Sequence, residues 1–187
     1  MYFNSVGPAN TPETLKIAVQ EAIKRQVSHI VAASNTGATV FALAEEAKKQ
    51  GYGGQLVCVT HVCGFKKNGE NELTDKARED LEKLGVKVCT AAHVLSGAER
   101  GLSRKFQGVF PVEIIAHTLR MFGQGAKVCV EIAVMALDAG LVPWGKPIIA
   151  LGGTVGGTDT AFLLTPSYAS AIMETKVHEV LCKPNGF

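Results

Sequence analysis

The sequence lacks an excess of charge of either sign. Its 187 residues include 19 Lys and Arg against 17 Asp and Glu, which gives a net charge of +2. Proteins that bind nucleic acids or membrane surfaces usually carry strongly basic patches, so we expect neither as a partner. The first ten residues, MYFNSVGPAN, contain no basic segment followed by an apolar one. We therefore expect no signal peptide and a cytoplasmic protein.

Uninterrupted apolar runs of membrane-spanning length are also missing. The most apolar long window, VCVEIAVMALDAGLVPW, contains Glu131 and Asp138, and both would be costly inside a bilayer. A buried helix is the better interpretation. The cysteines form no C-x-x-C pair, and we expect reduced core residues and no metal site. They are Cys58, Cys63, Cys89, Cys129 and Cys182.

What the sequence does contain is an alternation of apolar strands and helices. Strands are predicted for HIVAAS, QLVCVTH and VKVCTA, and further strands for PIIALGG, TAFLLT and KVHEVLCK. Continuously apolar strands separated by helices are typical of a parallel sheet that is covered on both faces. We therefore predict one α/β domain over residues 1–187, a three-layer α/β/α fold with a mainly parallel, mixed sheet.

The predicted helices carry recognisable start signals. Helices are expected at residues 11–26, 40–50, 74–84 and 127–139, with a broken helical region at 96–125. Thr11 and Thr74 are predicted to cap their helices, and Ser96 with Glu99 has the spacing of a capping box.

The stretch IVAASNTGATVFALA, residues 30–44, places a polar turn where a strand leads into a helix. A helix start offers unpaired N–H groups and the positive end of the helix dipole, which suit a phosphate monoester. Gly37 allows close backbone approach, and hydroxyl or amide groups surround it. They belong to Ser34, Asn35, Thr36 and Thr39. The alternative is that Ser34 or Thr36 only caps the helix.

Two better-known phosphate motifs are excluded. No G-x-G-x-x-G follows a strand, so the dinucleotide fingerprint is absent. The segment GLVPWGK imitates a P-loop, but Pro147 stands where the magnesium-binding Ser or Thr is required.

Other turns after predicted strands are candidate ligand contacts. GGTVGGTDT, with Gly153 and Thr154, either contacts a ligand or is a flexible connection. THVCGF offers His61 and Gly64, with an aromatic residue that can stack on a planar ligand. HVLSG offers Ser96 and Gly97. If their strands are parallel, these turns gather at one edge of the sheet and form a pocket.

Charged residues near these turns have two interpretations each. Glu131 lies in the apolar segment VCVEIAV, and burial is costly for an unpaired carboxylate. It either bonds backbone or a basic side chain such as Arg104, or it faces a ligand. Arg104 belongs to a basic cluster in SGAERGLSRK that either meets an anion or lies on a solvated helix face.

These motifs together resemble a known family. IVAASNTGATVFALA resembles the strand, turn and helix of the C-terminal domain of pyruvate kinase, where the turn binds the phosphate of an allosteric sugar bisphosphate. YFNSVGPANTPETL, VTHVCGF, HVLSGAERGLSRK, KVCVEIAVMALDAG and GGTVGGTDTA resemble small stand-alone archaeal and bacterial proteins with that fold. The resemblance covers nearly the whole chain.

The resemblance implies a ligand but no pyruvate kinase activity, because we expect no counterpart of the catalytic domains. Some members of the family are associated with flavin mononucleotide, which implies that this cofactor is bound here. The turn at Ser34, Thr36, Gly37 and Thr39 would hold its phosphate. The leading prediction is a binding protein for a phosphorylated small molecule. A flavin-dependent enzyme and a regulatory module without catalysis are the alternatives, and a homo-oligomer is left open.

Overall fold

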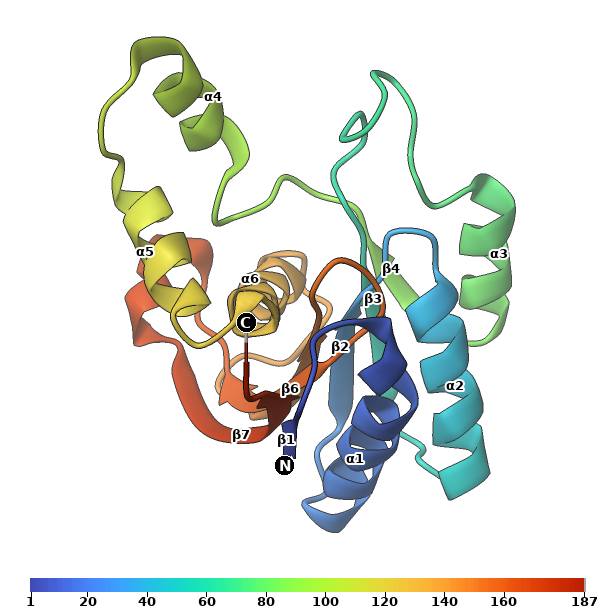
Figure 1. The fold of residues 1–187 in the computed structure, drawn as a ribbon. Helices are drawn as coiled ribbons and strands as arrows, with labels where there is room; N and C mark the ends of the chain where they lie inside the picture. Colours follow the sequence, from blue (N-terminus) through green and yellow to red (C-terminus); the bar gives the residue numbers. More distant parts are fainter. Residues whose placement is uncertain (187) are drawn as a thin grey trace.

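One mixed sheet of seven strands forms the centre of the molecule (Figure 1). The computed structural model describes residues 1–186. The strands are β1 Tyr2–Phe3, β2 His29–Ala33, β3 Gln55–Val59, β4 Lys87–Cys89, β5 Ile148–Gly152, β6 Thr160–Thr165 and β7 Lys176–Pro184. Their order across the sheet is β1-β7-β6-β5-β2-β3-β4. β1 was not predicted; it pairs with the end of β7, where Tyr2 lies opposite Lys183.

The directions of the strands decide where their ends meet. β5, β2, β3 and β4 are mutually parallel, whereas β6 runs antiparallel to both β5 and β7. The carboxyl ends of the four parallel strands therefore lie at the same edge of the sheet. The prediction of a mainly parallel, mixed sheet is confirmed.

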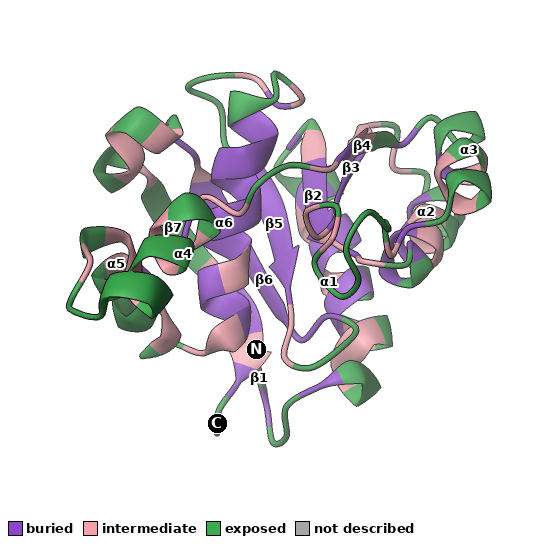
Figure 2. Cartoon of the chain, turned by 90° about the horizontal axis from the view of Figure 1, so that it is seen from above, coloured by how far each residue is buried: buried purple, intermediate pink, exposed green. Residues whose placement is uncertain are grey.

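Helices cover both faces of this sheet (Figures 1 and 2). They are α1 Thr11–Lys24, α2 Ala38–Gln50, α3 Asp75–Lys83, α4 Gly97–Phe106, α5 Pro111–Arg120 and α6 Gln124–Asp138, with short 3₁₀ helices at Pro8–Asn10 and Ala169–Glu174. α1, α2 and α3 pack on one face and α6 on the other. The three-layer α/β/α prediction is confirmed.

Apolar spacing explains which helix faces are buried. On α1, Leu15, Ala18, Val19 and Ala22 form one buried stripe, the pattern of a helix with one face on a core. α6 is different because residues 125–137 are buried almost all round, and only Val128 among them is partly exposed. Figure 2 shows it as the most deeply buried helix, between the sheet and α5.

Helix starts follow the predicted signals only in part. Thr74 caps α3 by accepting a hydrogen bond from the Ala77 N–H at 3.2 Å, as predicted. Thr11 does not cap α1; its hydroxyl accepts from the N–H of Thr158, which is far away in the sequence, at 2.9 Å. The capping box is also wrong, because the Glu99 carboxylate accepts from the Glu113 N–H in the first turn of α5.

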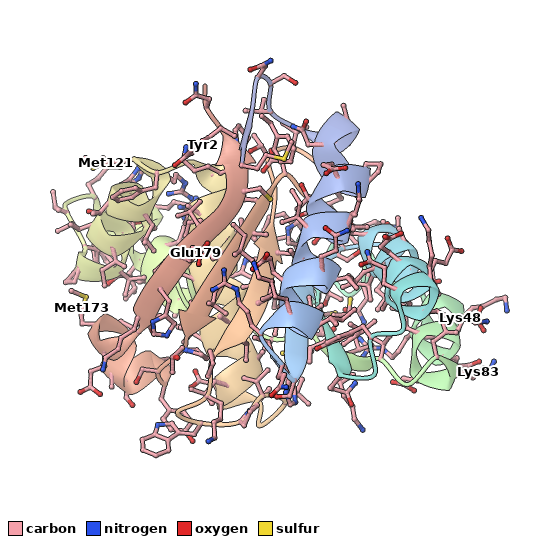
Figure 3. The ribbon with its side chains drawn as sticks, turned by 90° about the horizontal axis from the view of Figure 1, so that it is seen from below. Tyr2, Lys48, Lys83, Met121, Met173 and Glu179 are labelled. Carbon is pink, nitrogen blue, oxygen red and sulfur yellow. The ribbon has the colours of Figure 1, made fainter. Side chains whose placement is uncertain are left out.

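α4 and α5 form an arm that stands out from the body of the molecule (Figure 1). α4 has no buried residue, and large apolar side chains of the arm are exposed. They include Leu102, Phe106, Val109, Ile114, Met121 and Phe122. Figure 3 shows Met121 projecting from this side, whereas Lys48 and Lys83, in the last turns of α2 and α3, lie on the opposite side. Among the described residues, no helix has the length and apolarity needed to cross a membrane.

Two glycines allow α6 to lie very close to the sheet. A side chain at Gly152, the last residue of β5, would clash with the carbonyl oxygen of Gly125 and would lie 3.0 Å from the backbone nitrogen of Cys129. A side chain at Gly125 would clash with the Thr160 side chain on β6. The position of α6, and of every polar side chain on it, therefore depends on this contact.

We expect Gly152→Ala to destabilise the protein by about 1–3 kcal/mol, because the added methyl group pushes against the backbone of α6. A urea unfolding curve measures the loss. Gly101→Ala is the matched control, since a methyl group there meets nothing within 4 Å and replaces a helical glycine. Equal stabilities of the two variants would contradict the close contact.

Candidate functional site

A polar cavity of about 510 Å³ lies at the carboxyl edge of the parallel strands. We call it the carboxyl-edge cavity. Its walls come from the turn before α2, the loop after β3, the segment after β4, the arm, α6 and the loop between β5 and β6. Its volume is in the range of small-molecule sites.

The turn before α2 offers donors that have no acceptor. Gly37 is the N-cap residue, with φ +91°, and no side chain caps this helix. Among residues 1–186, the backbone N–H groups of residues 36–39 make no hydrogen bond, and neither do the hydroxyls of Ser34, Thr36 and Thr39. The interpretation of Ser34 or Thr36 as a helix cap is therefore wrong, and these groups remain available for an anion.

Gly37 itself has a role different from the predicted one. It is buried under the turn and is not part of the cavity wall. A side chain at this position would lie 3.1 Å from Phe41 and 3.2 Å from Leu73. The glycine is needed for its positive φ and for this packing, and the cavity-facing groups belong to its neighbours.

Basic side chains line another part of the cavity. Arg100 comes from α4, Arg120 from α5 and Lys127 from α6. Within the described chain, the buried Arg120 Nη1 and Arg100 Nε atoms have no hydrogen-bond partner, although Arg100 Nε lies 3.9 Å from the Glu113 carboxylate. Counting Lys66, four cationic and two anionic side chains line the cavity, the latter being Glu72 and Glu131. This excess of positive charge favours an anionic ligand.

Glu131 is held by its own helix. Its carboxylate pairs with Lys127, one turn earlier on α6, and accepts a hydrogen bond from the Leu95 N–H at 3.1 Å. Burial lowers the pKa of Lys127; Glu131 opposes this shift, while Arg120 and Arg100 add to it. Pairing with Arg104 is wrong, because Arg104 is exposed on α4 and does not reach the cavity.

Aromatic rings gather at a further part of the cavity wall. The ring centroids of His61 and Phe65 are 3.9 Å apart, and His93 lies 5.3 Å from His61 and 5.5 Å from Phe65. All three residues line the cavity. Burial lowers the pKa of His93, and the opposing effect of Glu131 does not cancel it. The three rings provide a surface for a planar group.

The glycine-rich loop closes the cavity from the side of β5. It connects β5 to the antiparallel β6, so it is a hairpin connection and also a cavity wall. Gly153, Val155, Gly156 and Gly157 line the cavity. The loop is fastened by the N-terminal segment, since the buried Asp159 accepts from the Gly7 N–H at 2.9 Å.

The structure brings together most of the predicted residues. The cavity wall contains Ser34, Asn35, Thr36, Thr39, His61, Ser96, Glu131 and Gly153. Four others lie nearby but outside it: Gly37 under the turn, Gly64 in the loop after β3, Gly97 in a neighbouring cavity and Thr154 in another. Arg104 is the one that points to solvent. Whether any of them binds a ligand stays a prediction.

Several wall residues were not predicted as site residues. Lys127 had a visible signal, because it precedes Glu131 by four residues in an apolar helix and such residues face the same side. His93 lay within one of the quoted turns. Arg120, Gln124 and Glu72 carried no pattern, because only the folding of the arm and of the loop after β3 brings them to the cavity.

These features define an α/β domain with an anion-favouring cavity at the carboxyl edge of its parallel strands. The family model "Pyruvate kinase, alpha/beta domain" matches residues 13–164. The chain therefore belongs to the pyruvate kinase alpha/beta domain family, which confirms the resemblance.

Solved structures similar to this chain include pyruvate kinases of Cryptosporidium parvum. One of them is 16% identical to this chain in sequence, with a TM-score of 0.40. The match covers 80% of this chain and 22% of that enzyme. A second, in complex with ADP, is 16% identical with a TM-score of 0.39 and coverages of 80% and 22%. The chain thus spans about a fifth of these enzymes, and the family assignment rests on the family model.

We expect Lys127→Met to destabilise the protein by about 3–5 kcal/mol, because it leaves Glu131 buried without its counter-charge. The double variant Lys127→Met/Glu131→Leu should regain most of this loss, since it removes both charges. Urea unfolding curves measure both, with Lys48→Met on the surface of α2 as the control. A double variant as unstable as the single one would contradict this account of the pair.

Proposed function

We propose that this protein is a cytoplasmic binding protein for a phosphorylated small molecule, and that flavin mononucleotide is its ligand. The observation that carries the proposal is the set of donors without acceptors at the start of α2. Backbone N–H groups and hydroxyls at a helix start form a phosphate site when they converge on one anion. The hydroxyls of Ser34, Thr36 and Thr39 and the N–H groups of residues 36–39 fit that description.

The cationic side chains support the same choice of ligand. Arg100 and Arg120 each have a buried nitrogen without a hydrogen-bond partner in the described chain. A buried guanidinium nitrogen that lacks a partner is costly, and a phosphate or a ring oxygen would satisfy it. A ligand without such acceptor oxygens would leave these groups unsatisfied.

The aromatic rings favour a ligand with a planar ring. Phe65, His61 and His93 form one cluster on the cavity wall, separate from the turn before α2. A mononucleotide has a phosphate at one end and a planar heterocycle at the other, which matches these two kinds of wall. In this proposal the turn holds the phosphate and the rings stack on the isoalloxazine. Bound flavin would supply redox chemistry.

We expect flavin mononucleotide to bind more tightly than riboflavin by at least about 1–2 kcal/mol, because only the former has the phosphate for the turn. Thr39→Val should remove a similar amount from the affinity for flavin mononucleotide and leave that for riboflavin unchanged. Thr39 suits this test because it lines the cavity and Val keeps its shape. Fluorescence titration of each flavin measures the dissociation constants.

The control is Thr118→Val, at an exposed position of α5. It should bind both flavins like the unaltered protein. Equal affinities of the unaltered protein for the two flavins would show that the turn holds no phosphate. A failure of both flavins to bind, together with binding of another phosphate monoester, would reject the flavin and keep the site.

A further inference from the structure

A histidine and a carboxylate are paired at the aromatic part of the carboxyl-edge cavity. His61 follows β3, and Glu72 lies at the other end of the same loop, with its side chain only 10% exposed. The distance from His61 Nδ1 to Glu72 Oε2 is 2.6 Å. The second carboxylate oxygen, Oε1, forms an ion pair with Lys66 at 2.6 Å.

The carboxylate of Glu72 stays ionised. Burial works to raise its pKa, but the hydrogen bonds and charges of Lys66 and His61 outweigh burial, and the pKa is below its ordinary value. An ionised carboxylate only accepts hydrogen bonds, so His61 Nδ1 must be the donor. In the neutral ring the other nitrogen, Nε2, then carries a lone pair.

His61 Nε2 has no hydrogen-bond partner among residues 1–186, and its ring forms part of the cavity wall. The ring packs against Phe65 and lies near His93, which fixes its plane. A histidine in a cavity wall, with one ring nitrogen held by a carboxylate and the other without a protein partner, has the arrangement of a general base.

We propose that His61 is a proton-transfer residue of a catalytic site in this cavity, positioned by Glu72, and that its substrate is a phosphorylated small molecule with an acidic C–H, N–H or O–H group. That the substrate carries a phosphate group rests on the function proposed above. The His61–Glu72 pair itself is an independent observation.

The step is a reversible proton transfer. The Nε2 lone pair takes the proton, and the electron pair of the broken bond stays on the substrate. The imidazolium formed is stabilised by the carboxylate of Glu72. The negative charge left on the substrate lies among the cationic side chains that face the cavity, Arg100, Arg120 and Lys127, whereas Glu131 is already paired with Lys127. Return of the proton to another atom of the substrate completes the reaction.

A purely structural role for the pair would be to close the loop after β3. Closure requires the Glu72 contact, but it does not require that Nε2 be unprotonated or that it face a ligand. An unprotonated Nε2 and its contact with a ligand therefore distinguish a proton-transfer residue from one that only closes the loop, and each can be measured.

The first experiment determines the tautomer of His61 in the unliganded protein from ¹⁵N chemical shifts, with His61→Asn for assignment. We expect the Nδ1–H form in the unaltered protein and a shift toward Nε2–H in Glu72→Ala. The matched control is Glu70→Ala, because Glu70 lies in the same loop and pairs with Lys67. Glu72→Met, which approximates the size of the side chain but has no oxygen to accept from Nδ1–H, repeats the test if Glu72→Ala unfolds. Nε2–H as the main form of the unaltered protein would overturn the proposal.

The second experiment measures how fast diethyl pyrocarbonate modifies each histidine, using peptide mass spectrometry. At flavin mononucleotide about ten times above its dissociation constant, roughly a tenth of the sites are free, so His61 should react about tenfold more slowly. His117, exposed on the arm, and His178, on β7, serve as internal controls and should react at unchanged rates.

The outcomes separate the two proposals. If flavin mononucleotide binds in titration but leaves the reaction of His61 unchanged, His61 does not face the ligand and the catalytic proposal is overturned, while binding stands. If flavin mononucleotide does not bind, the proposed ligand fails. In that case the tautomer experiment, which needs no ligand, still decides whether Glu72 keeps the proton of neutral His61 on Nδ1, as the proton-transfer proposal requires.

Discussion

The close contact between α6 and the end of β5 determines the rest of the site. Gly125 and Gly152 have no side chains, so the first turns of the helix lie directly on the sheet. A side chain at either position would clash with the facing element. Because Lys127 and Glu131 are on α6, this contact sets how far the buried ion pair lies from the turn before α2. It also explains why the helix is buried nearly all round, since the sheet lies on one side and α5 on another.

The cavity combines hydrogen-bond donors that have no acceptor within the described chain. Ser34, Thr36, Ala38 and Thr39 at the helix start line the cavity. Its wall also includes Arg100 and Arg120, whose buried guanidinium nitrogens have no partner in the described chain. Buried donors are rarely left without a partner, and in the described chain Arg100 Nε and Arg120 Nη1 are such donors. Most of the local acceptors are already in use, because Glu131 is held by Lys127 and Leu95, and Asp159 by Gly7 and Thr160. Both proposals therefore depend on an anion from outside the chain as the acceptor of these donors.

The arrangement also separates two kinds of chemistry within one cavity. The turn before α2 presents N–H and hydroxyl donors at the start of a helix of 13 residues. The loop after β3 instead presents His61, whose orientation depends on one carboxylate, Glu72. A phosphate held at the turn would leave the remainder of the ligand to reach the rings. The proposed binding and the proposed proton transfer should therefore respond to different substitutions.

The sequence by itself determined the fold class, the succession of helices and strands apart from β1, and the turns that line the cavity. Apolar periodicity and strand composition reflect local burial, and parallel strands necessarily place their following turns at one edge. Only the tertiary structure decided which charged residues meet there. Glu131 pairs with Lys127 and not with Arg104, Thr11 and Glu99 bond distant backbone instead of their own helices, and Glu72 and Arg120 join the cavity. Long polar side chains choose partners by distance in the folded chain, which local sequence patterns do not encode.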